Sequence, residues 1–241
     1  MNLRQIYLAV NQFSYKPAYR RNLPHVQPPG ATFFLTFRLA GSLPQTVLTQ
    51  WNREREWLAY LAYSNPDYYE QVNQNFERVW FKKFETLLDG ASVGPLWLKD
   101  PRLAAIVVES LHHRDGTKYQ LDAFTIMPNH AHIVIKPLPV LATHPGNLTC
   151  ITRKKSKAAE VEYHSLASIM QSLKGYTAFR ANAVLGRRGE FWAHESYDHW
   201  VRDNDEWQRT VAYVLNNPLK AGYVESWQDW KWNYRRGDAN W

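Results

Sequence analysis

The chain has 241 residues, of which 45% are hydrophobic, which is typical of one well-cored globular domain with extensions and argues against a disordered protein. The 29 Lys and Arg outnumber the 22 Asp and Glu, and the resulting formal charge of +7 favours an anionic partner. Cys150 is the only cysteine, which excludes an intrachain disulfide framework and a cysteine-based zinc site.

No stretch of the chain approaches the ~20 consecutive apolar residues that a membrane-spanning helix needs. The N-terminal sequence lacks the long apolar core of a secretory signal peptide. A single cysteine fits a reducing compartment. We therefore expect a cytoplasmic protein with no membrane partner.

The first third of the chain predicts an arm, a strand and a helical insertion. Residues 1–30 become Pro-rich, show no periodicity and predict an irregular N-terminal arm. Residues 31–41 are dense in β-forming residues and predict a strand. Residues 45–63 and 69–89 each carry apolar residues at helical spacing, so the range 45–89 predicts two helices inserted after this strand.

The middle of the chain predicts a helix, a hairpin and a loop. Residues 100–113 open with Asp-Pro, a common helix start, and carry an apolar stripe. Residues 115–127 predict a turn and a strand, and a Pro-Asn pair then leads into a second strand over 130–137. Residues 138–163 contain prolines and the basic run TRKKSK without an apolar face, so we predict a basic loop.

Residues 165–186 are the strongest predicted helix, because a serine is placed to cap it and a glycine to stop it. Residues 190–201 predict a strand, and the range 203–241 predicts a helix to about Asn216 followed by a Trp-rich tail. Without the insertion, the order is βαββαβ. We therefore predict an α+β fold, a ferredoxin-like antiparallel sheet with helices packed on it, as one domain over residues 1–241.

Two histidines lie two residues apart in the second strand of the hairpin. Because side chains alternate along a strand, His130 and His132 project from one face while Ala131 projects from the other. Two neighbouring imidazoles can hold one divalent cation. The pair alone is weak support for a metal site, since two histidines can also serve as hydrogen-bonded packing groups.

Several motifs together resemble the HUH nucleases and, more narrowly, the REP-associated tyrosine transposases, relatives of the IS200-like single-tyrosine transposases. The motifs are MPNHAHIVI at 127–135, SLKGYTAFRAN at 172–182, FWAHESYDHWVRD at 191–203, YVLNNPLKAGYV at 213–224 and PPGATFFLTFRLAGSLP at 28–44. They occur in the order expected for the family. The insertion at 45–89 and the loop at 138–163 match nothing in it.

The resemblance implies a metal-dependent endonuclease and strand transferase that acts on single-stranded DNA at hairpins or REP-like repeats. It implies that His130 and His132 hold Mg²⁺ or Mn²⁺, and that Tyr176 is the nucleophile that forms a 5′-phosphotyrosine. Relatives include monomers and homodimers, and both states stay open for this chain. Tyr176 lies about 80° from the apolar stripe of its predicted helix, at the edge of the buried face, so its ring can pack while its hydroxyl stays reachable.

The third metal ligand does not follow the pattern of the resembled enzymes, which often take it from one turn past the tyrosine. That position is Arg180, which cannot bind a cation. Glu195 is the leading candidate because a carboxylate suits Mg²⁺, and His199 is the second. Tyr197 is a possible rival nucleophile.

Basic residues at three places are candidates for DNA contacts, although exposed arginines and lysines often serve only as solvated surface. They are Arg180, Arg153, Lys154, Lys155, Lys157, Arg187 and Arg188. Two other functions stay open. One is a domesticated DNA-hairpin-binding protein with weak catalysis, and the other is an unrelated metallohydrolase whose activity would survive Tyr176→Phe.

Neutralising Arg153, Lys154, Lys155 and Lys157 together is expected to flatten the salt dependence of DNA binding. Each phosphate contact that is lost lowers the number of counterions released when the DNA binds. The measurement is the slope of log affinity against log salt concentration. An unchanged slope would assign these residues to solvated surface.

Overall fold

The computed structural model describes residues 28–64, 79, 81–90, 94–144, 147–150, 152–155 and 158–238. The predicted N-terminal arm, residues 1–30, therefore lies almost wholly outside the described part of the chain. None of the described helices is both long and apolar enough to cross a membrane.

A five-stranded antiparallel sheet forms the centre of the molecule, with the strand order β8-β1-β3-β2-β9. Its first four strands have the order of a ferredoxin-like sheet, which confirms the predicted fold class. The strands are β1 Thr32–Leu39, β2 Tyr119–Ile126, β3 His130–Pro137, β8 Trp192–Val201 and β9 Asn233–Arg235. β3 is the middle strand, with β1 on one side and β2 on the other, so the two histidines lie at the centre of the sheet.

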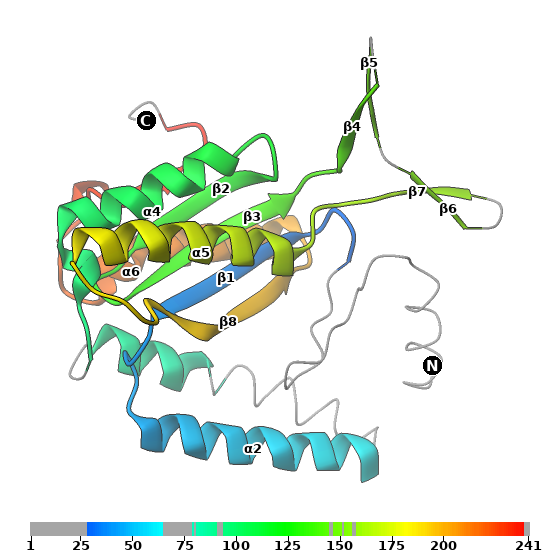
Figure 1. Cartoon of the computed structure of the whole chain (residues 1–241). Helices are drawn as coiled ribbons and strands as arrows, with labels where there is room; N and C mark the ends of the chain where they lie inside the picture. The colour runs from blue at the N-terminus through cyan, green and yellow to red at the C-terminus, as the bar shows by residue number, and fades with distance from the viewer. Residues whose placement is uncertain are drawn as a thin grey trace.

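Two helices cover one face of this sheet, α4 Pro101–Arg114 and α5 Leu166–Val184 (Figure 1). Both start at the predicted caps: Asp100 accepts a hydrogen bond from the backbone N–H of Arg102, and Ser165 accepts one from Ser168. Their apolar faces pack on alternate residues of β1, β2 and β3 and form the largest core cluster.

The opposite face of the sheet is covered by α6, Asn204–Lys220, and by helical residues 81–89 (Figure 1). α6 packs Val211, Val214 and Leu215 on Phe34 and Val134 of the sheet. It continues four residues beyond the predicted end at Asn216 and includes a proline. A proline is tolerated in this last turn because only the backbone bond to the carbonyl four residues earlier is lost.

The insertion at 45–89 is helical where it is described. α2, Gln45–Ser64, confirms the first predicted helix, and residues 81–89 are the end of the second. Phe84 and Leu88 form a small core with Leu43, against which Leu48 and Trp51 of α2 pack. The short 3-10 helix η1, Trp97–Lys99, then leads to α4. The insertion therefore carries a core of its own beside the sheet.

The prediction of a loop without secondary structure at 138–163 is wrong. Two hairpins project from the body of the molecule there (Figure 1), formed by β4 Leu141–His144, β5 Asn147–Cys150, β6 Thr152–Lys155 and β7 Ala158–Val161. Four-residue strands in two-stranded ribbons are held by backbone pairing and need no apolar face. For this reason, the hydrophobic pattern could not reveal them.

The Trp-rich tail returns to the sheet and adds an edge strand that the sequence did not predict. After the 3-10 helix η2, Trp227–Asp229, β9 pairs with β2 over three residues. The Asn233 amide donates to the carbonyls of Leu215 at 2.9 Å and Trp227 at 2.8 Å. This side chain ties the C-terminal part of α6 to the edge of the sheet.

Asp203→Ala is expected to lower the free energy of unfolding by about 1 kcal/mol, because the Asp203 carboxylate caps α6. Its Oδ1 accepts a hydrogen bond from the Glu206 backbone N–H at 2.8 Å. Urea denaturation measures the change. Asp205→Ala is the matched control, because the exposed Asp205 lies in the same turn and acts only through the helix dipole. Equal losses for the two variants would contradict the capping role.

Candidate active site

His130 and His132 lie on the face of β3 that is covered by α6. Ala131, Ile133 and Ile135 alternate with them and enter the core under α4 and α5, whereas Val134 packs against α6. Both histidines are completely buried, with 0% of their surface exposed. The predicted projection of the two rings from one face is therefore correct, and it points them at α6.

Each imidazole has an oxygen partner for its Nδ1 atom. His130 Nδ1 lies 2.6 Å from Asn129 Oδ1, and His132 Nδ1 lies 2.7 Å from Thr36 Oγ1. The Asn129 amide nitrogen donates to the Leu88 carbonyl at 3.0 Å, which turns Oδ1 toward His130 and makes the His130 Nδ1–H the donor. This bond leaves the Nε2 lone pair of His130 available, as in metal-binding histidines, whereas Thr36 Oγ1 can either accept from or donate to His132 Nδ1.

The two Nε2 atoms face each other at 3.0 Å. Burial lowers the pKa of His130 to about 3. Burial, reinforced by the nearby His130, lowers the pKa of His132 well below its ordinary value. Both rings are therefore neutral at physiological pH, the form in which imidazole binds a metal.

α6 brings Tyr213 and Asn217 to the histidine pair. The two residues lie four apart, so they share one face of the helix. The Tyr213 ring centroid is 5.8 Å from that of His132, and the Tyr213 side chain is only partly buried. Asn217 is fully buried, and its Oδ1 has no hydrogen-bond partner among the described residues. The arrangement places a phenol ring beside His132 and a buried amide oxygen one turn further along the same helix.

Helical residues 81–89 bring Glu85 to the same place. Tyr213 donates its hydroxyl hydrogen to Glu85 Oε2, which lies 3.4 Å from His132 Nε2. Asn217 Nδ2 is also 3.4 Å from Oε2, whereas the buried Oε1 has no hydrogen-bond partner among the described residues. Burial raises the pKa of Glu85 to about 8, although the bond from Tyr213 opposes this. Burial and the Glu85 charge raise the pKa of Tyr213.

The donor set fits a divalent cation. Two neighbouring ligands of an octahedral ion with bonds of ~2.1 Å lie about 3 Å apart, which is close to the Nε2 separation of 3.0 Å. The orphaned Asn217 Oδ1 offers a further oxygen. Across the described residues, no group of three or more His, Cys, Asp or Glu side chains is already poised to hold a metal ion. Asn217 belongs to none of these types, and Glu85 directs Oε2 to Tyr213.

Tyr176 lies on the other face of the sheet, so the structure does not bring it together with the histidine pair. α5 packs Leu173 and Ala181 into the core beneath α4, and Tyr176 is 38% exposed at the edge of that packing. Its hydroxyl accepts a hydrogen bond from Arg180 Nη1 at 2.9 Å. The edge position on the helix is as predicted, but the edge faces α4 and solvent. This placement gives no support to Tyr176 as the nucleophile of the histidine pair.

Glu195 and His199, the candidates for the third ligand, both lie on β8. The charge of Glu195 acts on Arg38, whose pKa burial lowers and Glu195 raises. His199 Nε2 is 2.9 Å from Glu206 Oε1 at the start of α6. The carboxylate beside His132 is that of Glu85, and the role of Glu195 as the third ligand stays a prediction.

Tyr197, the rival nucleophile, shares the histidine face of the sheet because it pairs with Thr36. Its ring stacks on Phe81 at 4.5 Å between centroids and meets Phe34 edge-on at 6.1 Å. The Tyr213 ring contacts His132 from α6. The packing of Tyr197 holds helical residues 81–89 against the sheet.

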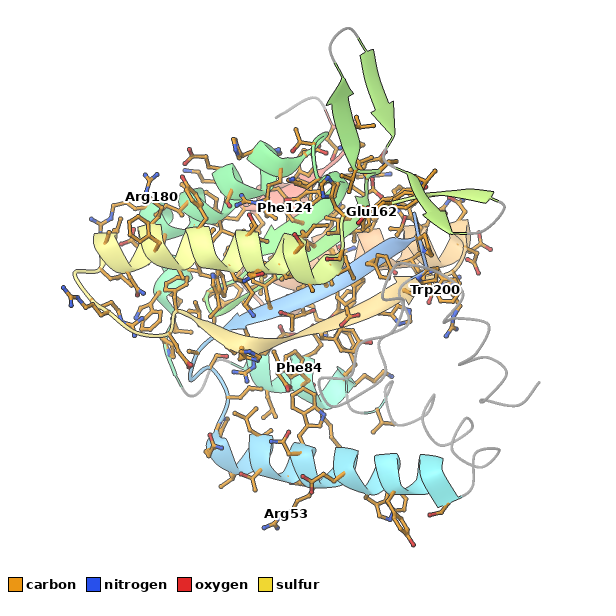
Figure 2. All side chains as sticks on the ribbon, turned by 45° about the vertical axis from the view of Figure 1, so that its right-hand side comes forward. Arg53, Phe84, Phe124, Glu162, Arg180 and Trp200 are labelled. Carbon is orange, nitrogen blue, oxygen red and sulfur yellow. The ribbon has the colours of Figure 1, made fainter. Side chains whose placement is uncertain are left out.

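Where they are described, the candidate DNA-contacting residues lie apart from the histidine pair, and the role of all of them stays a prediction. Arg180 points outward from α5. The segment that covers the histidines, marked by Phe84, lies on the far side of the sheet (Figure 2). Arg187 lies over the Trp97 ring at 4.2 Å, and Arg188 is exposed. Arg153, Lys154 and Lys155 are strand residues of β6, and Lys157 lies outside the described residues.

The sequence carried signals for the missed residues. Tyr213 and Asn217 stand four residues apart, the same spacing as Tyr176 and Arg180, but an amide oxygen can bind a cation and a guanidinium cannot. Glu85 occupies the apolar stripe that Phe81, Phe84 and Leu88 form at helical spacing. An acidic residue in such a stripe indicates a buried carboxylate with a specific partner.

No protein-family model matches the chain. A protein of Haemophilus influenzae named "Putative REP-associated tyrosine transposase" is 24% identical over 115 residues, which cover 48% of this chain and 58% of that protein. An uncharacterised protein of the same organism is 28% identical over 104 residues, which cover 42% of this chain and 54% of that protein. The chain thus spans just over half the length of these curated relatives.

A solved structure of a REP-associated tyrosine transposase bound to a REP hairpin is also similar to this chain. The matched region covers 89% of this chain and 80% of the transposase chain, with 15% identity and a TM-score of 0.43. The resemblance to the REP-associated tyrosine transposases that the sequence motifs indicate is confirmed by the first of the curated relatives.

His132→Ala is expected to lower the free energy of unfolding by about 2–4 kcal/mol, because it leaves a cavity beside Phe34 and removes the partner of Thr36. Urea denaturation at neutral pH measures the change. His194→Ala is the matched control, since His194 is an exposed histidine of the same sheet, and its loss should cost less than about 0.5 kcal/mol. Comparable losses for both variants would contradict a buried structural network around His132.

Proposed function

Because the chain is similar to a REP-associated tyrosine transposase, we propose that it is a metal-dependent nuclease and strand transferase of single-stranded DNA, with Tyr213 as its nucleophile. The observation that carries this proposal is the meeting of Tyr213 with His130 and His132 on one face of the sheet. Tyr176, on the other face, does not have this placement.

His130, His132 and Asn217 would hold Mg²⁺ or Mn²⁺, which would polarise a phosphodiester and stabilise its leaving group. The residues themselves supply the rest of the site. Thr36 and Asn129 fix the orientation of the imidazoles. The surrounding aromatic rings, among them Phe34 at 5.5 Å from His132, exclude water.

The chemistry requires a single displacement at phosphorus. The Tyr213 oxygen forms a bond to phosphorus and gives up its proton, while the bond from phosphorus to the 3′ oxygen breaks and that oxygen leaves as a 3′-hydroxyl. The product is a 5′-phosphotyrosine. Because the phosphodiester energy is kept in the covalent link, attack by another 3′-hydroxyl reverses the step and transfers the strand without ATP.

The DNA substrate proposed is a hairpin or REP-like repeat with single-stranded flanks. The net charge of +7 favours binding to phosphates. The exposed Phe179 precedes Arg180 on α5, which offers an aromatic ring and a positive charge to unpaired bases.

One observation favours a second candidate, a DNA-hairpin-binding protein with weak catalysis. Both histidines have no exposed surface, and Glu85 is 2% exposed above them. A phosphodiester reaches these nitrogens only if one of the covering elements, α6 or helical residues 81–89, moves. A protein in which both elements stay in place would bind hairpins without cutting them.

The test is a gel assay for a covalent protein–DNA adduct. Purified protein is incubated with Mn²⁺ and end-labelled hairpin oligonucleotides from DNA that flanks its gene. Tyr213→Phe is expected to lower the adduct yield by roughly 10³-fold or more, the scale of removing a nucleophile. Tyr176→Phe is the matched control and should keep the wild-type yield, because it removes only the exposed bond to Arg180.

The reverse result, an adduct lost in Tyr176→Phe and kept in Tyr213→Phe, would return the nucleophile to α5. Tight hairpin binding by the wild-type protein without any adduct would support the second candidate.

A further inference from the structure

We propose that Glu85 is a metal ligand of this site, so that helical residues 81–89 of the insertion are a part of the active site. The inference rests on the proposed function, because it concerns the ion that His130 and His132 would hold. Glu85 comes from a segment that matches none of the motifs of the resembled family. Glu85 would supply the carboxylate ligand that the sequence analysis expected from Glu195.

The first argument is the position of the carboxylate. Glu85 Oε2 lies 3.4 Å from His132 Nε2, which itself lies 3.0 Å from His130 Nε2. Both separations are close to the ~3 Å between neighbouring ligands of one ion. Mg²⁺ and Mn²⁺ prefer oxygen donors, and a site of two imidazoles and one amide gains the charge it needs from a carboxylate.

The second argument is the unmet bonding of Glu85. The side chain is 2% exposed, and its Oε1 has no hydrogen-bond partner among the described residues. The polar groups at Oε2 are the Tyr213 hydroxyl, the Asn217 amide and the His132 ring. None of them is a fixed cation, since Lys220 bonds to Asp89 instead. A buried carboxylate without a cation is costly, and a divalent ion would remove that cost.

The third argument is that packing fixes Glu85 from both ends of its segment. Phe81 stacks on Tyr197 at 4.5 Å between centroids, on one side of Glu85. On the other side, the Leu88 carbonyl accepts from Asn129, the residue that orients His130. A segment that only covered the sheet would be served better by an apolar residue at position 85, because Phe84 and Leu88 beside it are core residues.

The ion would take the place of one present contact. The Glu85 carboxylate now accepts the hydrogen bond from Tyr213. Binding of a cation at Oε2 would compete with the Tyr213 bond, and the phenol would then be free to face the substrate. Glu85 would couple loading of the metal to exposure of the nucleophile.

The experiment measures Mn²⁺ binding to the full chain without DNA, by isothermal titration and by the Mn²⁺-dependent rise in melting temperature. Glu85→Gln keeps the shape of the side chain and an oxygen that can accept from Tyr213, but it removes the charge. We expect its Mn²⁺ affinity to fall about tenfold or more. Glu56→Gln is the matched control, because Glu56 is an exposed glutamate of the same insertion, and its affinity should equal that of the wild type.

Equal Mn²⁺ affinity in Glu85→Gln and the wild type would overturn the inference and leave Glu85 as part of a cover. If Glu85→Gln fails to fold, as judged by circular dichroism, Glu85→Asp replaces it, because this variant keeps the charge and withdraws the oxygens by one methylene. We expect the same loss of affinity for Glu85→Asp, and wild-type affinity would overturn the inference.

His132→Asn separates this inference from the proposed function. Mn²⁺ binding that is lost in His132→Asn but kept in Glu85→Gln would refute the role of Glu85 alone. A wild-type chain that binds no Mn²⁺ and forms no covalent adduct with hairpin DNA would refute both. Loss of Mn²⁺ binding in both variants, with the control unchanged, supports both.

Discussion

Two neutral imidazoles are buried at the centre of the sheet, and the surrounding residues follow from the need to give every imidazole nitrogen a partner. A turn residue, Asn129, and a residue of the neighbouring strand, Thr36, take the two Nδ1 atoms. The two Nε2 atoms are left facing each other and Glu85. An unpaired polar atom in this dry interior would cost about 1–3 kcal/mol, so the network constrains β1, the hairpin turn and the insertion together.

The sequence predicted the architecture well because local signals and burial patterns agreed for most elements. The helix expected at 165–186 is observed over Leu166–Val184, since the serine cap and the glycine stop limit it chemically. The strands of the hairpin and their inward faces also follow from alternation. The β4–β7 hairpins and β9 could not be predicted, because short strands held by backbone pairing and by one asparagine leave little trace in the hydrophobic pattern.

Of the residues in the candidate site, the sequence predicted only the two histidines on β3. The histidines were identified because strand parity alone decides that they share a face. The nucleophile depends on which face of the sheet each helix covers, and helical periodicity does not carry that information. Tyr176 and Tyr213 both lie at the edge of amphipathic helices, but α5 and α6 pack on opposite faces. The place of Glu85 in the site could not be predicted for a similar reason, because its bond to Tyr213 joins residues 128 positions apart in the chain.

α6 is anchored at both ends, by the Asp203 cap at its start and by the Asn233 amide that holds the Leu215 carbonyl. Tyr213 stands between these anchors, on the part of the helix that packs against the sheet. A DNA strand joined to this tyrosine would be attached to a helix that is held in place on both sides of the attachment point. The second DNA end would then have to travel to the first, so the geometry of the folded DNA, more than any swing of the protein, would decide which two ends are joined.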